Sequence, residues 1–153
     1  MATGWDLEVL EGKDGARAEM TAVVKVPEKL MKERMVGEFW ERNSESRDGL
    51  MKQNAEGKSA GEVEDLLLEF MDKWFGSEVI LAGNSIHQDR KFIDREWPRV
   101  AKRLHYRMLD VSAWKVYFEG ARGKKFTKQE AHRALDDIQG SIEELKWYVG
   151  ELK

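Results

Sequence analysis

The chain has 153 residues, of which 41% are hydrophobic and 36% charged, and these proportions indicate one folded domain and exclude a disordered chain. The formal net charge of -3 gives no global indication of nucleic-acid binding, so any such binding must use a local basic surface. No apolar run approaches the ~20 residues of a membrane span. The start, MATGWDLEV, has no signal-peptide pattern, and the absence of cysteine is compatible with a reducing compartment.

The first half of the chain is predicted to form a hairpin followed by helices. Residues 5–11 and 19–26 have the composition of strands, and the GKDGA segment between them has that of a turn. Residues 28–43 are predicted to be helical. Ser59 and Glu62 then form a capping-box pattern, which marks the start of an amphipathic helix. Its apolar residues recur at helical spacing and are Val63, Leu66, Leu67, Phe70, Met71 and Trp74.

The second half alternates strands with helices. In chain order we predict a buried strand within 78–85, a helix over 87–96, a turn from Pro98 to Leu104, a strand within 105–111, a connection over 117–129 and a helix from about 133 to 149. This alternation implies parallel strand pairing, and the opening hairpin adds an antiparallel part. The predicted class is therefore α/β, with a mixed sheet flanked by helices.

Three segments concentrate polar residues where strands give way to helices, which is the usual position of sites in open α/β folds. They are GNSIHQDRKF, HYRMLDVS and AHRALDDI. Carboxylates from two elements with a nearby histidine suit a hard divalent ion such as Mg²⁺ or Mn²⁺, with the histidine as general base. The residues that could carry this chemistry are Asp89, Tyr106, Arg107, Asp110, Ser112, His132 and Asp137.

Each of these features also has a purely structural interpretation. An acid in the first turn of a helix interacts favourably with the helix dipole, so Asp89 does not require a ligand. His87 and His105 are interpreted as ordinary polar residues. The basic run between Arg90 and Arg107 is typical of a solvated surface. Taken alone, the residues predict an α/β domain with a candidate metal site.

The same segments, in the same order, closely resemble the oligoribonucleases, the short-RNA members of the DEDDh family of 3′-to-5′ exonucleases. The similarity is nearly continuous from Ala82 to Tyr148 and extends more loosely to FWERNSESRDGL upstream. There Trp40 falls on the family's base-stacking tryptophan. Asp48 stands where the family has serine, and Glu45 where it has histidine, a departure that would weaken phosphate contact.

The resemblance implies an RNase H-like mixed sheet, a cytoplasmic homodimer and a two-metal site, for Mg²⁺ or Mn²⁺, that hydrolyses short single-stranded RNA to mononucleotides. It assigns metal binding to Asp89 and Asp137, and the role of general base to His132. Tyr106 falls on a tyrosine that reaches the active site from the other subunit. The substrate-binding positions are Trp40, Ser85, Arg107 and Ser112.

The beginning of the chain departs from the family. The family's first strand carries an Asp-x-Glu pair that binds both metals, and WDLE offers Asp6 and Glu8 on one face of a strand. However, no apolar run precedes these acids, the family's Thr-Gly turn does not follow, and DLEVLEG resembles the hairpin after the family's second strand.

We therefore expect a single domain over residues 1–153 that lacks the family's first one or two strands. Three interpretations stay open. The chain is an active exoribonuclease, an inactive oligonucleotide-binding or dimerisation module, or a truncated fragment of the enzyme.

Overall fold

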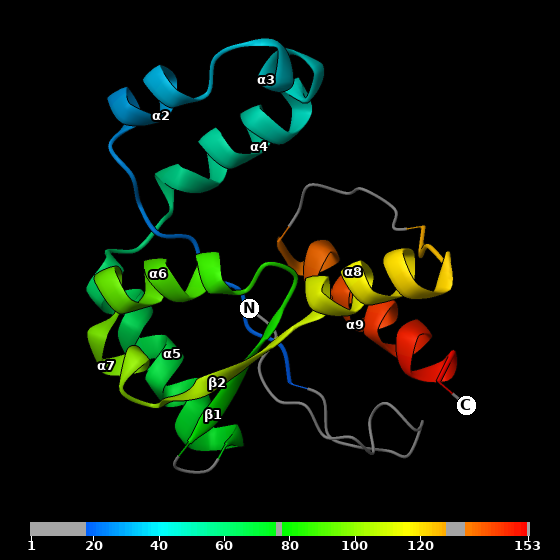
Figure 1. The fold of residues 1–153 in the computed structure, drawn as a ribbon. Helices are drawn as coiled ribbons and strands as arrows, with labels where there is room; N and C mark the ends of the chain where they lie inside the picture. The colour runs from blue at the N-terminus through cyan, green and yellow to red at the C-terminus, as the bar shows by residue number, and fades with distance from the viewer. Residues whose placement is uncertain (1–17, 76–77, 128–133, 153) are drawn as a thin grey trace.

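The computed structural model describes residues 18–75, 78–127 and 134–152. The predicted strand over 5–11 lies outside these residues, as do Asp6, Glu8 and His132. The elements, in chain order, are helices α2 (Glu28–Arg34), α3 (Glu38–Arg42), α4 (Ser44–Ala55) and α5 (Ala60–Trp74), strand β1 (Val79–Gly83), helices α6 (His87–Glu96) and α7 (Pro98–Ala101), strand β2 (Leu104–Asp110), and helices α8 (Val111–Arg122) and α9 (Ala134–Gly150) (Figure 1).

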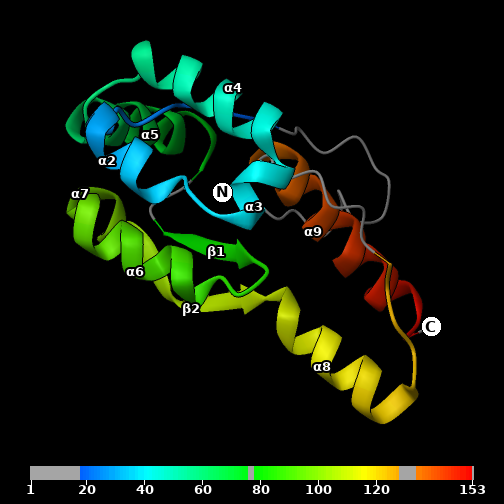
Figure 2. The same cartoon turned by 90° about the horizontal axis from the view of Figure 1, so that it is seen from above.

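The sheet of the described residues consists of β1 and β2, which pair in parallel. Gly83 pairs with Asp110, so the carboxyl ends of both strands lie at the same edge. The loop to α6 and the start of α8 follow from this edge (Figure 2). The α/β class and the parallel pairing of the second half are therefore confirmed, as is the helix predicted over 87–96.

The predicted antiparallel part of the sheet is not found among the described residues. Residues 19–26, predicted as a strand, form only a parallel bridge between Val24 and Lys58. The Lys25 N–H donates to the Lys58 carbonyl at 2.7 Å, and the Lys58 N–H donates to the Val23 carbonyl at 2.9 Å. The prediction of a strand was wrong because, among the described residues, this segment pairs with other backbone only at Lys58, in the short connection between α4 and α5.

Helices α2, α3 and α4 form an arm that extends from the rest of the molecule (Figure 1). The side-chain amide of Asn54 fastens its two ends together. Its Oδ1 accepts from the Val26 N–H and its Nδ2 donates to the Val26 carbonyl, both at 2.8 Å. A Cβ atom at Gly57 would lie 3.0 Å from the Lys25 backbone, so any other residue here would push the two segments apart.

Two predictions, a helix over 28–43 and a connection over 117–129, were wrong in their extent. The helix predicted over 28–43 is interrupted, because Gly37 has a φ of 96° that separates α2 from α3. The first six residues of the connection predicted over 117–129 form the second half of α8. Of its two glycines, Gly120 lies within the helix, whereas Gly123 ends it in the left-handed conformation. Helix α4 has no apolar periodicity to reveal it, since Asn54 is its one buried residue.

The buried apolar side chains form two clusters. In the first, Val63, Leu67 and Met71 of the predicted apolar face of α5 pack against β1, β2, α6 and α7, whereas Trp74 of that face is 45% exposed. In the second, α8 packs against α9. The first cluster contains Val63, Leu67, Met71, Val79, Leu81, Ile86, Ile93, Val100 and Leu104, and the second contains Val111, Phe118, Leu145 and Tyr148.

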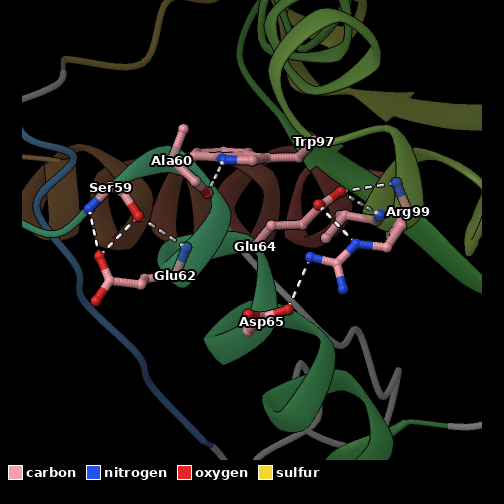
Figure 3. A network of polar contacts seen from close by, with 8 residues as sticks. Ser59, Ala60, Glu62, Glu64, Asp65, Trp97 and Arg99 are labelled. Atoms are coloured by element: carbon pink, nitrogen blue, oxygen red, sulfur yellow. Dashed lines mark hydrogen bonds and ion pairs between the residues drawn. The ribbon is translucent and has the colours of Figure 1, made fainter.

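A polar network fastens the beginning of α5 to α7 (Figure 3). The predicted capping box is present: the Ser59 N–H donates to Glu62 Oε2 at 2.8 Å, and Ser59 Oγ accepts from the Glu62 N–H at 3.3 Å. One turn further on, the buried Glu64 carboxylate accepts from the Arg99 N–H at 2.7 Å, from Arg99 Nε at 2.8 Å and from the Val100 N–H at 3.3 Å. Glu64 thus satisfies first-turn amides of α7 that have no partner within that helix.

The ionisation of Glu64 depends on this network. Burial raises the pKa of its carboxyl, but the hydrogen bonds from Arg99 and Val100 and the charge of Arg99 outweigh burial. The pKa is therefore held below its ordinary value of 4.5. The exposed Asp65 carboxylate contacts the same guanidinium at 2.7 Å.

We expect Glu64→Ala to lower the free energy of unfolding by about 2 kcal/mol, because it leaves two amides of α7 without an acceptor and removes the ion pair. Asp65→Ala is the matched control, since it removes an exposed carboxylate from the same arginine and an exposed pair contributes little. Urea denaturation at pH 7 measures both variants. Equal losses would contradict the role given to the buried carboxylate.

The Glu64 contribution should depend on pH. A carboxyl whose pKa is lowered by folding stabilises the folded state above its ordinary pKa, and this contribution disappears as the pH falls through the lowered value. The difference in unfolding free energy between the wild type and Glu64→Gln should therefore be constant above about pH 5.5 and shrink below 4.5. A difference that grows as the pH falls would overturn this account.

Candidate functional site

The loop after β1 brings together two of the predicted phosphate-binding residues. The Ser85 N–H donates to Asp110 Oδ1 at 3.0 Å and to Ser112 Oγ at 2.9 Å, and the two serine Oγ atoms lie 3.3 Å apart. Ser85 has a φ of 50°, which is uncommon for a residue other than glycine. This left-handed turn directs the Ser85 N–H toward the end of β2. Ser85 and Ser112 are thus neighbours although 27 residues separate them.

Asp110 organises this pair of serines. Its Oδ1 also accepts from the Ser112 N–H at 2.9 Å, so it caps the N-terminus of α8 while it holds the loop after β1. Its Oδ2 lies 3.6 Å from Nδ1 of His87, at the start of α6. The sequence placed Asp110 among the polar residues but gave it no role. The Asp-Val-Ser order at the start of a helix is the capping signal that could have identified it.

A buried polar group lies behind the loop. The Glu144 carboxylate, on α9, accepts from Asn84 Nδ2 and from the Tyr148 hydroxyl, both at 2.9 Å. Glu144 is 3% exposed and Tyr148 is fully buried. Burial, together with the hydrogen bond to Glu144, raises the pKa of the Tyr148 hydroxyl above its ordinary value.

The sequence did not predict these buried polar residues. In the helix predicted from about 133 to 149, the apolar residues Ile138, Ile142 and Val149 recur at helical spacing, but they are only partly buried. The buried face of the helix is polar in part, because Asn84 offers a hydrogen-bond donor beneath it. Its members are Ser141, Glu144, Leu145 and Tyr148.

The two predicted metal-binding acids occupy similar positions. Asp89 lies in the first turn of α6 and Asp137 in the first turn of α9, and both are exposed. Exposed carboxylates fit a hard divalent ion. Within 18–75, 78–127 and 134–152, no three His, Asp or Glu side chains are placed to hold one metal ion together. Asp6, Glu8 and His132 lie outside these ranges.

The remaining predicted residues lie on β2 and in the arm. Tyr106 is 73% exposed, its ring stacks on that of His105 with centroids 4.4 Å apart, and the Arg107 guanidinium lies 5.2 Å from its centroid. Trp40 is a partly buried residue of α3, in edge contact with Phe39. Among the described residues, no hydrogen bond or ion pair joins Arg107 or Trp40 to the serine pair, and Figure 1 shows α3 in the arm, away from the loop after β1.

Comparison with known proteins identifies the family of this chain. The sequence profile of the family described as Exonuclease (RNase T) matches residues 32–145, about three quarters of the chain. The chain belongs to this exonuclease family. The match runs from Lys32, within α2, through α3, α4 and the serine pair to Leu145 in α9. No helix within the described parts of the chain is both long and apolar enough to cross a membrane.

Several proteins named oligoribonuclease are similar to this member of the family. One from Neisseria gonorrhoeae is 40% identical over 71% of this chain and 65% of its own length. One from Neisseria meningitidis serogroup B is 37% identical over 95% of this chain and 76% of its own length. One from Francisella tularensis subsp. holarctica is 40% identical over 74% of this chain and 65% of its own length. The chain thus matches less than two thirds of the gonococcal protein.

Asp110 and Asp89 are expected to differ in what they contribute to stability. Asp110→Ala removes the cap of α8 and the acceptor of the Ser85 N–H, and should lower the free energy of unfolding by about 1 kcal/mol. Asp89→Ala removes an exposed acid for which the described chain offers no hydrogen-bond or ion-pair partner, and should cost at most roughly 0.5 kcal/mol. Thermal and urea denaturation compare the two. A larger loss for Asp89→Ala would support the structural interpretation of that residue.

Proposed function

We propose that this protein is a 3′-to-5′ exoribonuclease that hydrolyses very short RNA oligonucleotides to mononucleotides, with Mg²⁺ or Mn²⁺ as cofactor. The observation that carries the proposal is the pairing of Ser85 with Ser112 at the carboxyl end of the parallel strands. Membership of the exonuclease family and the similarity to proteins named oligoribonuclease support it. The resemblance further supports a homodimer in the cytoplasm.

The serine pair suits the terminal phosphate of an oligonucleotide. The Asp110 carboxylate already accepts from the Ser85 and Ser112 N–H groups, and one serine hydroxyl donates to the other, so the second hydroxyl is the donor that the pair offers to a ligand. The two hydroxyls lie beside the N-terminus of α8, where the helix dipole favours an anion. The Arg107 guanidinium would add bidentate hydrogen bonds to phosphate oxygens.

The acids and aromatic residues would complete the site. Asp89 and Asp137 would hold divalent ions, which stabilise the charge of the scissile phosphate and activate water. His132 would accept the proton of the attacking water. The Trp40 ring would stack on a base, an interaction that every base offers. The exposed Tyr106 would reach the active site of a second copy of the chain.

Incubation with a 5′-labelled diadenylate and Mn²⁺ tests the proposal, and we expect release of mononucleotide. His132→Ala should abolish hydrolysis and retain binding. Arg107→Ala should weaken binding about tenfold, the effect of one charge-assisted hydrogen bond. Arg95→Ala is the control for charge, because Arg95 is exposed on α6 and pairs with Glu96.

Binding without hydrolysis by the wild-type chain would instead identify an oligonucleotide-binding module. A wild-type chain that neither binds nor hydrolyses the dinucleotide would overturn the proposal.

A further inference from the structure

The buried Glu144 carboxylate has a position that the proposed chemistry does not explain. It is 3% exposed, and its partners in the described chain are the neutral donors of Asn84 and Tyr148 rather than a basic side chain. A carboxylate is stable in such a position only when hydrogen bonds replace its hydration. Each of its two oxygens accepts one hydrogen bond, Oε2 from Asn84 in the loop after β1 and Oε1 from Tyr148 on α9. These two bonds hold the carboxylate between the helix and the loop.

Glu144 determines the orientation of Asn84. A carboxylate can only accept hydrogen bonds, so the Asn84 side chain must present its NH₂ group to it. Asn84 Oδ1 then points away from the carboxylate, where it is buried without a hydrogen-bond partner among the described residues. Asn84 directly precedes Ser85, whose left-handed backbone orients the serine pair. The carboxylate therefore fixes the first residue of the loop that carries Ser85.

The other end of this link is the helix that bears Asp137. Glu144 follows Asp137 by two helical turns and lies on the same face of α9. Between them, the Ser141 hydroxyl donates to the Asp137 carbonyl at 2.9 Å. The helix thus holds Asp137 at a fixed offset from Glu144. The bond from Asn84 to Glu144 consequently joins the segment of Asp137 to the segment of Ser85.

We propose that Glu144 is a positioning residue that, through Asn84, holds the Ser85 loop in register with the helix of Asp137. The phosphate and metal roles of these two residues rest on the proposed function. The positioning itself rests on the contacts of Asn84, Glu144 and Tyr148.

Reversal of the hydrogen bond tests the proposal. Asn84→Asp places a second carboxylate against Glu144 and should release the loop. Glu144→Gln alone replaces the charge-assisted hydrogen bond from Asn84 with a weaker neutral one and should loosen the loop slightly. In the double variant Asn84→Asp/Glu144→Gln, the new amide can donate to Asp while its oxygen still accepts from Tyr148. The same Glu144→Gln change should therefore loosen the Ser85 loop in the wild type but restore its order in a chain that already carries Asn84→Asp. If the two substitutions acted only by disturbing packing, their effects on the loop would add, and Glu144→Gln would loosen the loop in both backgrounds.

Two measurements follow the loop. Hydrogen exchange of the Ser85 amide, by NMR, should rise about tenfold in Asn84→Asp and return most of the way in the double variant. The dissociation constant for diadenylate should likewise rise in Asn84→Asp and fall back toward the wild-type value in the double variant. Glu143→Gln is the control, because it removes the charge of an exposed neighbour on α9. It should leave both values unchanged.

The outcomes separate the two proposals. Additive losses in the double variant, or Ser85 exchange that no variant changes, would overturn the positioning role. A wild-type chain that does not bind diadenylate would overturn the proposed function, and Ser85 exchange would still decide the role of Glu144.

Discussion

Parallel pairing of β1 with β2 is the constraint on which the candidate site depends. It places Gly83 beside Asp110, so that the residues after both strands meet at one edge. Asp110 can then accept from the loop after one strand and from the first turn of the helix after the other. An antiparallel pair would place these two ends at opposite edges and separate the serines. The candidate site therefore requires parallel strand pairing, because no single side chain could bring the two strand ends together.

Local signals predicted the elements that depend on local interactions. The capping box of Ser59 and the apolar spacing of α5 are complete within one segment, and the structure confirms both. The segment 19–26 has strand composition, but a strand also needs a partner along its length, which composition does not reveal. Gly37 and Gly120 look alike in sequence, yet only Gly37 breaks a helix, because only its backbone is left-handed.

The candidate site was predictable to a smaller extent. The resemblance selected Ser85 and Ser112, and the structure brings them together. It also selected Asp89, Asp137 and His132, whose joint role stays a prediction, as does the absence of the family's first strands. Residue patterns did not reveal Glu144, because a buried carboxylate on a helix looks like any solvated acid until its tertiary partner is known. Long-range hydrogen bonds of this kind leave no local periodicity.

The attachment of the arm depends on neutral groups. Asn54 binds the backbone of Val26 through an uncharged amide, and Gly57 allows the two segments to approach by the absence of a side chain. Salt screens charges, but it has little effect on a hydrogen bond between two amides. Changes in ionic strength that weaken surface ion pairs of the arm, such as the one between Arg42 and Glu38, therefore leave its point of attachment intact. The contacts that close the base of the arm bearing Trp40 are thus insensitive to ionic strength.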